Sequence, residues 1–332
     1  MSWRNEVATE RHFEAIRDLF FLTHGYRRPV SFDRWKLFST DFGRCPLIVA
    51  MQGDRCVGLY TVLPTPLILD GVGISGAQSV DTMTHPDFRG RGMFLSLARS
   101  CYEEAANDIA VMYGLPNENS YPGFIKHLGW MHLDDITRWV RPLAVPRRLP
   151  RLVAALADPL IKAVTGLGEV TGSIGATAVA DMPSLSAAIR PAARCFVEKS
   201  ARWLTWRYAA DAGSAFRRLT IGQCETPDGL IVFEELPADD GDSRHSTRIM
   251  EWLGRTAEAK ETILRQFVRA QARRGCRSIS YVTNDPRSRS TLRRNLFFER
   301  GRFPLIAKAL NAAATGTILA PGDMIIQGGD MD

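Results

Sequence analysis

Two arginines and two glycines alternate in a short segment, Arg89-Gly90-Arg91-Gly92, which separates a predicted strand from a predicted helix. Glycines let a ligand approach the backbone, and arginine side chains supply charged donors for phosphate. The free N–H groups at a helix start and the helix dipole also favour anions. We expect this arginine–glycine loop (residues 89–92) to bind a phosphate group. The alternative is an ordinary helix entry with arginines in the turn.

The loop and its neighbours resemble the GNAT superfamily of acyl-CoA-dependent N-acyltransferases. The signature of that family, R/Q-x-x-G-x-G/A, follows a strand and opens the central helix, and residues 89–94 fit its first five places. At the sixth place, Phe94 departs from the usual small residue. The preceding His85-Pro86-Asp87-Phe88, the later residues 114–130 and the order of elements over residues 1–142 also resemble the family.

The resemblance implies how acetyl-CoA or another acyl-CoA binds as co-substrate. The pantetheine arm would lie beside the strand that carries Met83 and Thr84. Asn117 would bond the pantetheine amides or the acceptor, unless it only forms a turn. The amine would attack the thioester directly in a ternary complex, and no metal is required. The residues implied to hold the pyrophosphate are Arg89, Gly90, Arg91, Gly92, Met93 and Phe94.

Proton transfer requires further groups, because a protonated amine cannot attack and the departing thiolate benefits from an acid. Asp81 in the central strand is the first candidate for the base, with a structural role for it or a water chain as the alternatives. His85 is the second candidate, unless it is only a loop residue. The family often places the acid, a tyrosine, where this chain has Ile125. Tyr121, one helical turn earlier, is the candidate that replaces it, unless it has only a packing role.

The elements around these residues predict an α/β fold with a mixed sheet. Helices are expected after Thr9 and over residues 92–107, and strands over residues 56–62 and 74–84. The segment Gly71-Val72-Gly73-Ile74-Ser75-Gly76 has the letters of the dinucleotide fingerprint GxGxxG. Because a strand rather than a helix is expected to follow it, we exclude a dinucleotide site there.

The second half repeats the order of the first, which indicates an internal duplication and a fold of two GNAT-like domains. Strands are expected over residues 217–222 and 278–283, with a helix over residues 257–274 before the second of them. The loop before that helix lacks the glycine pattern and carries Glu258, so this degenerate copy is expected to shape the acceptor pocket rather than bind CoA. The predicted parts are a catalytic GNAT-like domain at 1–142, a linker with an amphipathic helix at 143–172 and the degenerate domain at 173–332.

Two segments after residue 142 carry alternative interpretations. The helix within residues 152–164 either packs between the domains or lies on an anionic membrane surface. Packing is favoured, because Asp158-Pro159 interrupts the helical pattern. Residues 203–208, which contain three aromatic rings, either form a wall for a sugar or nucleotide or belong to the core.

Length and composition agree with a folded protein of two domains. The chain has 332 residues, of which 45% are hydrophobic and 23% charged, and a formal net charge of +6 that comes mainly from arginine. Six cysteines without CxxC pairing disfavour a zinc site and a disulfide framework. No apolar run reaches about 18 residues and the first residues lack the apolar core of a signal, so we expect a cytoplasmic protein.

These observations predict an acyl-CoA-dependent N-acyltransferase, in the simplest case an acetyltransferase, with a small-molecule amine as partner. The likeness to bacterial acyltransferases of polysaccharide and specialised-metabolite pathways, together with the arginine excess, indicates a phosphorylated acceptor such as a nucleotide-linked amino sugar. One alternative is a small amine, amino acid or aminoglycoside as acceptor. The others are a protein that senses acyl-CoA without turnover and a non-catalytic module that binds nucleic acid or anionic lipid.

Overall fold

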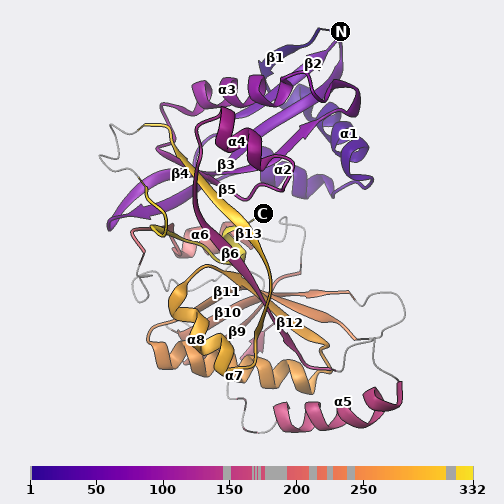
Figure 1. Ribbon diagram of the computed structural model, residues 1–332, viewed down its shortest axis with the longest axis vertical. Coiled ribbons are helices and arrows are strands. Elements are labelled where there is room, and N and C mark those ends of the chain that lie inside the picture. Colours follow the sequence, from indigo (N-terminus) through magenta and orange to yellow (C-terminus); the bar gives the residue numbers. More distant parts are fainter. Residues whose placement is uncertain are drawn as a thin grey trace.

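A single mixed sheet runs through the molecule and joins its two halves (Figure 1). The computed structural model describes residues 2–144, 151–166, 168, 170, 173–175, 193–208, 215–222, 227–237, 244–311 and 319–331. Within these residues the sheet has 14 strands, twelve of them in the order β1-β2-β3-β4-β5-β13-β6-β12-β11-β10-β9-β7. Strand β8 pairs with β3 and β14, beside this path. The result is the mixed α/β architecture that the sequence predicts.

The N-terminal half places two pairs of helices on opposite faces of its strands. Leu47 and Val49 point toward α1 and α2, whereas Ile48 and Ala50 point toward α3 and α4, because neighbouring residues of a strand face opposite sides. The elements are β1 (Arg4–Val7), α1 (Phe13–His24), α2 (Val30–Phe38), β2 (Leu47–Gln52), β3 (Arg55–Leu69), β4 (Val72–Thr84), α3 (Met93–Ala105), β5 (Val111–Gly114) and α4 (Tyr121–His127).

The predicted strand and helix on either side of the arginine–glycine loop are confirmed. Strand β4 extends through the glycine-rich segment as far as Thr84, so the letters GxGxxG lie in a strand and no helix opens there. Helix α3 begins at Met93, directly after the loop. The short 3-10 helix Pro86–Phe88 fills the connection between them.

The C-terminal half repeats this order of antiparallel strands, a helix and a parallel strand. Strands β10 and β11 are antiparallel, and α7 then leads to β12, which is parallel to β11. The predicted strands and helix of this half are confirmed, and the duplication stays a prediction. The first half ends with β6 (Met131–Pro142). The elements that follow are α5 (Arg151–Gly166), β7 (Ser173–Gly175), β8 (Cys195–Val197), α6 (Ala201–Arg207), β9 (Arg217–Gly222), β10 (Pro227–Leu236), β11 (Ser246–Gly254), α7 (Ala257–Arg273), β12 (Ser278–Thr283), α8 (Pro286–Arg294), β13 (Phe298–Ala309) and β14 (Met324–Ile325).

The two halves exchange strands. Strand β13, from the end of the chain, pairs with β5 between Ile306↔Gly114 and Ala309↔Val111. Strand β6, from the end of the first half, pairs with β12 between Pro142↔Ser278 and Thr137↔Thr283. Strands β6 and β13 also pair with each other, and Figure 1 shows them passing together from one half to the other. The predicted boundary after residue 142 therefore divides the chain where β6 ends, but each half of the sheet is continued by a strand of the other.

The linker region contains the expected helix, α5, which packs against α7. The carboxylate of Asp158 forms an ion pair with Arg244, which precedes β11. Both contacts are with the C-terminal half, and Figure 1 shows α5 on the side of that half away from the N-terminal half. The helix therefore packs on the C-terminal half, and not between the two domains as expected. Residues 145–150, 167, 169, 171 and 172 of the predicted linker lie outside the described residues. Among the helices that the structure describes, none has the length and apolar character needed to cross a membrane.

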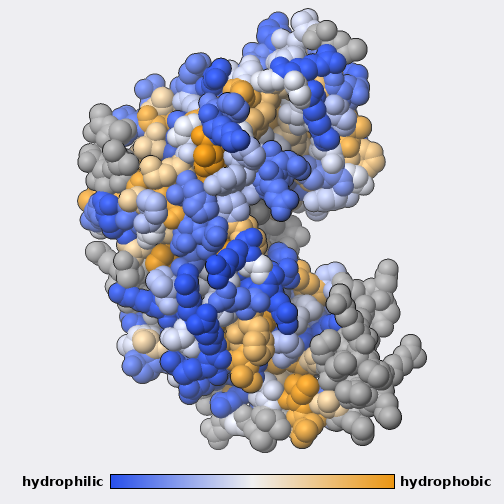
Figure 2. All heavy atoms as spheres, in the orientation of Figure 1, coloured by the Kyte–Doolittle hydropathy of each residue, from blue (hydrophilic) through white to orange (hydrophobic). Residues whose placement is uncertain are grey.

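The aromatic segment at residues 203–208 belongs to the core. Its rings are 1–6% exposed, and Trp206 stacks on Trp35 of α2 with ring centroids 4.8 Å apart. The expectation of a wall for a sugar or nucleotide is therefore replaced by its alternative, a core helix between the two halves. The described cysteines are free and buried. On the face that Figure 2 shows, hydrophobic atoms form separate small groups in a mostly hydrophilic surface.

Candidate active site

Strands β4 and β5 separate at the centre of the N-terminal half. Their parallel pairing ends at Ser79↔Gly114. Directly beyond it β4 has a bulge, because Val80 pairs with Thr61 and Met83 with Leu59, so that two residues of β4 lie opposite one of β3. Residues 80–84 therefore continue β4 beyond its last pair with β5. We call this end of the pairing, between residues 80–84 and the residues that follow Gly114, the β4–β5 opening.

The arginine–glycine loop provides unpaired backbone donors at one end of this opening. Gly90 and Gly92 have φ values of 73° and 77°, a left-handed conformation that favours glycine. Gly92 caps α3 without a side chain, and the first helical hydrogen bond to it comes from the N–H of Ser96. The N–H groups from Met93 to Leu95 therefore have no backbone acceptor among the described residues. A Cβ atom at Gly90 or Gly92 would meet no atom within 4 Å, so the space beside the loop is open.

The two arginines of the loop are free to meet an anion. Arg89 donates from Nε to the Thr84 carbonyl at 3.4 Å, and the guanidinium of Arg91 lies 5.7 Å from the ring centroid of Phe88. Both side chains are exposed, and neither forms an ion pair with a residue that the structure describes. Free N–H groups, two cations and open space are what a pyrophosphate needs, so the loop fits the diphosphate of CoA.

Phe94 is accommodated by a glycine in the facing helix. A Cβ atom at Gly123 of α4 would lie 2.7 Å from the Phe94 ring, and the ring also packs edge-on against Phe124. The aromatic residue at the sixth place of the signature is therefore compatible with the loop, because α4 has a glycine, without a side chain, at the point of contact.

Asp81 lies in the bulge and is held by two cations. Its carboxylate is 2.9 Å from Arg28 and 3.0 Å from Lys36, and its side chain is 11% exposed. Burial alone would raise the pKa of Asp81, but the charges of Lys36 and Arg28 outweigh burial and lower it. Its φ of 45° is also left-handed. A carboxylate in this state is a poor proton acceptor at neutral pH, and its contacts fix the shape of the bulge.

His85 is part of the loop structure. Its Nδ1 accepts a hydrogen bond from the Asp87 N–H and caps the short helix, while Nε2 lies 3.0 Å from a guanidinium nitrogen of Arg55. The side chain is largely buried. These contacts agree with the alternative that sequence analysis gave for His85, a loop residue.

Tyr121 contacts His132, which in turn contacts Asp135, and neither of these two residues was predicted as part of the site. The hydroxyl group of Tyr121 lies 3.3 Å from Nδ1 of His132, the second residue of β6. The Nε2 atom of His132 lies 3.6 Å from the carboxylate of Asp135. Tyr121 stands at the first position of α4, at the end of the loop that leaves β5. His132 was missed because no sequence motif links it to Tyr121; the contact depends on β6 returning beneath α4.

The other predicted contacts lie around the opening. Met83 is buried on the α1 face, where its sulfur accepts a hydrogen bond from the Thr23 hydroxyl at 3.3 Å, and Thr84 ends β4. The Asn117 side chain accepts hydrogen bonds from the N–H groups of Asn119 and Ser120 at 3.1 and 3.0 Å. Its turn-forming role is therefore present, with its amide nitrogen still exposed. Among the described residues, no group of three or more metal-binding side chains is found.

Comparisons with known proteins agree with this geometry. Residues 6–133 match the family model of the acetyltransferase (GNAT) domain. Similar solved structures include GCN5-related N-acetyltransferases from Anabaena variabilis and Kribbella flavida, with TM-scores of 0.63 and 0.61 and identities of 12% and 15%. The alignments cover 94% of this chain and 74% and 73% of those chains.

A third similar structure is a conserved protein of unknown function from Enterococcus faecalis, a probable N-acyltransferase. Its TM-score is 0.62 at 13% identity, over 93% of this chain and 73% of that one. No curated protein matches the sequence. At these identities the structures establish the fold, and the family model places the GNAT domain over the site described above. Residues 6–133, which contain this site, thus match the GNAT acetyltransferase domain, and the chain as a whole has the fold of these N-acetyltransferase structures.

Proposed function

We propose that the protein transfers an acetyl group from acetyl-CoA to a primary amine by direct attack in a ternary complex. The observation that carries this proposal is the arginine–glycine loop, which presents free N–H groups and two uncommitted cations beside the β4–β5 opening. The loop holds the diphosphate of the co-substrate, and the backbone of Met83 and Thr84 holds the pantetheine arm. The exposed N–H groups of β4 polarise the thioester carbonyl.

We assign the proton that the departing thiolate receives to Tyr121. His132 orients the phenol, and Asp135 holds His132. Asp81 is better suited to holding the bulge than to accepting the proton of the amine, because its carboxylate is already paired twice. We therefore assign the proton that the amine loses to a water chain, through which it restores the Tyr121 phenol after the thiolate has been protonated. The acceleration then comes mainly from holding the amine and the thioester in attack geometry.

The acceptor reaches the opening from the side of α1 and α2, opposite the arginine–glycine loop. Helices α1 and α2 cover the face of β4 that α3 and α4 leave free, and Arg28 links their connection to Asp81. Tyr26 in this connection is 57% exposed. An exposed aromatic ring supports a sugar-like amine, such as a nucleotide-linked amino sugar, over a simple alkylamine. The arginines beside it, Arg27 and Arg28, are already paired with carboxylates, so they add nothing to the case for a phosphate.

At least five of the eleven arginines between Arg265 and Arg302 form ion pairs, which weakens the alternative of a nucleic-acid-binding module. Glu261 pairs with two arginines of this region and Glu299 with two more. Paired charges have less to gain from phosphates than the free arginines of the loop. We therefore propose that the partner is a small molecule rather than nucleic acid or lipid.

Calorimetric titration with acetyl-CoA tests the proposal first. Wild type is expected to bind, and Gly92→Glu is expected to lose binding, because it places a carboxylate where the diphosphate belongs. Gly53→Glu is the matched control, since Gly53 also has a positive φ and open space around it but lies in the β2–β3 turn. A panel of amines, including nucleotide-linked amino sugars and aminoglycosides, then identifies the acceptor by release of free CoA. Absence of acetyl-CoA binding by the wild type would contradict the proposal, and binding without turnover on any amine would favour an acyl-CoA sensor.

A further inference from the structure

A cavity of about 520 Å³ lies in the C-terminal half, where β11 and β12 separate. The parallel pairing of these strands ends at Ile249↔Tyr281. The cavity extends from the start of α7 and α8 to Ile68 and Gly71, in the hairpin that joins β3 to β4. Its size is typical of a small-molecule site. We call it the β11–β12 cavity.

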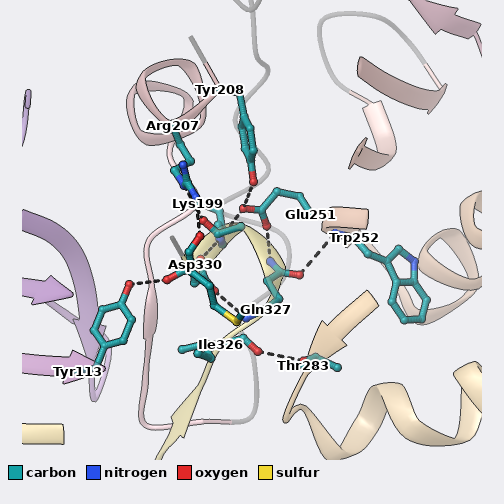
Figure 3. Close-up of polar contacts among 12 residues, drawn as sticks. Tyr113, Lys199, Arg207, Tyr208, Glu251, Trp252, Thr283, Ile326, Gln327 and Asp330 are labelled. Carbon is teal, nitrogen blue, oxygen red and sulfur yellow. Dashed lines mark hydrogen bonds and ion pairs between the residues drawn. The ribbon is translucent and has the colours of Figure 1, made fainter. Parts of the chain in front are cut away.

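Gln327 and Asp330, in the last described segment, line this cavity, and we call the part that they line its floor. Figure 3 shows the polar contacts of both residues. Gln327 forms a bridge with Thr283, and its side-chain oxygen accepts hydrogen bonds from the Tyr281 hydroxyl at 2.8 Å and from the Trp252 N–H at 3.4 Å. Its side-chain nitrogen donates to Glu251. The polar groups at the point where β11 and β12 diverge are therefore already hydrogen-bonded to Gln327. They are not available to a reacting molecule, so the cavity is suited to binding and not to group transfer.

The cations of the cavity differ in whether they already have a partner. Lys199 is engaged by Glu251 and Asp330, at the floor. Lys260 lies 3.6 Å from the Asp285 carboxylate and 4.6 Å from the ring centroid of Trp252. The other two cations that line the cavity are Arg255 and Arg287.

Arg255 and Arg287 form no ion pair with a residue that the structure describes. Arg255 donates from Nε to the Pro227 carbonyl, which leaves its terminal nitrogens available, and both side chains belong to exposed residues at the mouth. Of the acids that line the cavity, Glu261 is paired with arginines outside it, and only Glu198, near β8, has no ion pair among the described residues. The mouth between α7 and α8 is therefore positive, and Glu198 lies on the β8 side.

We propose that the β11–β12 cavity binds a phosphorylated small molecule. Arg255 and Arg287 hold the phosphate at the mouth through charge-assisted hydrogen bonds. The uncharged part of the ligand enters between Phe196 and Ile325, and Glu198 accepts a hydrogen bond from a hydroxyl or amino group on it. Such a ligand has an anionic end and a polar, partly apolar body.

This site differs in construction from the arginine–glycine loop. In the N-terminal half, residues 85–92 connect β4 to α3, whereas only Arg255 and Thr256 connect β11 to α7. The connection in the second half is thus too short to form a loop like residues 85–92, and the anion is held here by side chains. The inference does not depend on acyl transfer, because no residue of the β4–β5 opening lines the cavity.

The test is calorimetric titration of the full chain carrying Gly92→Glu, so that the loop of the first half no longer contributes. The probes are ADP, glucose 6-phosphate, CoA and inorganic pyrophosphate, with adenosine as the probe that lacks phosphate. At least one phosphorylated probe is expected to bind with a stoichiometry of one, and adenosine is not. Adding Arg287→Glu or Arg255→Glu is expected to weaken binding about tenfold or more, the loss of one charge-assisted hydrogen bond.

Arg289→Glu is the matched control, because Arg289 is an exposed arginine of the same helix that does not line the cavity. It is expected to leave binding unchanged, and thermal melting of each variant confirms folding. The proposal is wrong if no phosphorylated probe binds at millimolar concentration, or if Arg289→Glu weakens binding as much as Arg287→Glu. Neither outcome bears on acetyl-CoA binding by the wild type, so this inference and the proposed function fail separately.

Discussion

The ammonium group of Lys36 lies 3.0 Å from a carboxylate oxygen of Asp81, although Lys36 belongs to α2 and Asp81 to the bulge in β4. The Lys36 side chain is 1% exposed, so it has almost no contact with water. A buried charge of this kind requires its partner, because leaving it unpaired costs far more than the pair itself contributes. This ion pair therefore connects the shape of the β4–β5 opening to the stability of the N-terminal half.

Asp81→Asn is expected to destabilise the protein by about 3–5 kcal/mol, the cost of leaving a buried charge without its partner. Urea unfolding at pH 7 measures the difference. Asp18→Asn serves as control, because the Asp18–Arg27 pair is exposed and its loss is expected to cost about 0–1 kcal/mol. Equal effects of the two substitutions would show that Asp81 does not hold the bulge.

The effect of Asp81→Asn is expected to depend on pH. The charges of Lys36 and Arg28 lower the pKa of Asp81 below its ordinary value of 3.8, despite burial. The ionised carboxylate therefore stabilises the folded state above pH 3.8, and this contribution is lost as the pH falls through the lower, folded-state pKa. Unfolding free energies of wild type and Asp81→Asn should differ by a constant amount from pH 7 to 5 and converge below pH 4. A difference that already vanishes near pH 6 would mean that Asp81 has a raised pKa, as a base would require.

Tyr121→Phe is expected to lower kcat about 100-fold with little change in the KM for acetyl-CoA, because the thiolate loses its proton donor. His132→Gln should lower kcat less, since it removes only the group that orients the phenol, and it should shift the pH profile of kcat. His127→Gln on the exposed side of α4 is the control. These values are measured with the amine that the panel identifies, and an unchanged kcat for Tyr121→Phe would remove the tyrosine from the mechanism.

The buried ion pairs of Lys199 with Glu251 and Asp330, at the floor of the β11–β12 cavity, predict that the loss of the cation costs more stability than the loss of one carboxylate. Burial alone would lower the pKa of Lys199, but the carboxylates of Asp330 and Glu251 raise it. Lys199→Met should cost about 3–5 kcal/mol, because two carboxylates are left without a cation. Burial raises the pKa of Glu251, so its charge is already penalised. Glu251→Gln should therefore cost only about 1–2 kcal/mol, and urea unfolding that gives the reverse order would contradict the pairing.

The contact between Phe94 and Gly123 can be tested with a double-mutant cycle. Gly123→Ala is expected to destabilise by about 1–3 kcal/mol, because the added methyl group meets the Phe94 ring. In a Phe94→Leu background the same substitution should cost less than half as much, since the smaller side chain leaves room. Urea unfolding of the four proteins measures the coupling. Additive effects would show that the ring moves away from Gly123 without cost.

The sequence was sufficient for features that are local in the chain. The glycines at 90 and 92, the helix after them and the strand before them are set by neighbouring residues, so the conformation of the arginine–glycine loop could be predicted. The alternation of apolar residues likewise predicted β9, β12 and α7. The fit of Phe94 at the sixth place of the signature could not be predicted in this way, because it depends on Gly123 in another helix.

Features that depend on distant contacts could not be predicted. The Asp81 carboxylate looks like a free base in the sequence, and only folding brings Lys36 and Arg28 to it. His132 becomes a partner of Tyr121 only because β6 returns beneath α4. The β11–β12 cavity combines residues from both halves with the end of the chain, and no motif marks such a combination. The exchange of β6 and β13 is equally invisible, since both strands carry ordinary strand sequences.

That exchange has a consequence during synthesis on the ribosome. The edge of β5 stays open until the residues of β13 have left the exit tunnel, so the N-terminal half cannot complete its sheet while the C-terminal half is still being made. An unpaired edge of this kind attracts other strands and promotes aggregation. A translation product that stops before Phe298 therefore contains the whole arginine–glycine loop and β4–β5 opening, yet lacks the strand that supports them. We therefore expect such a product to bind acetyl-CoA at the proposed site more weakly than the 332-residue chain does.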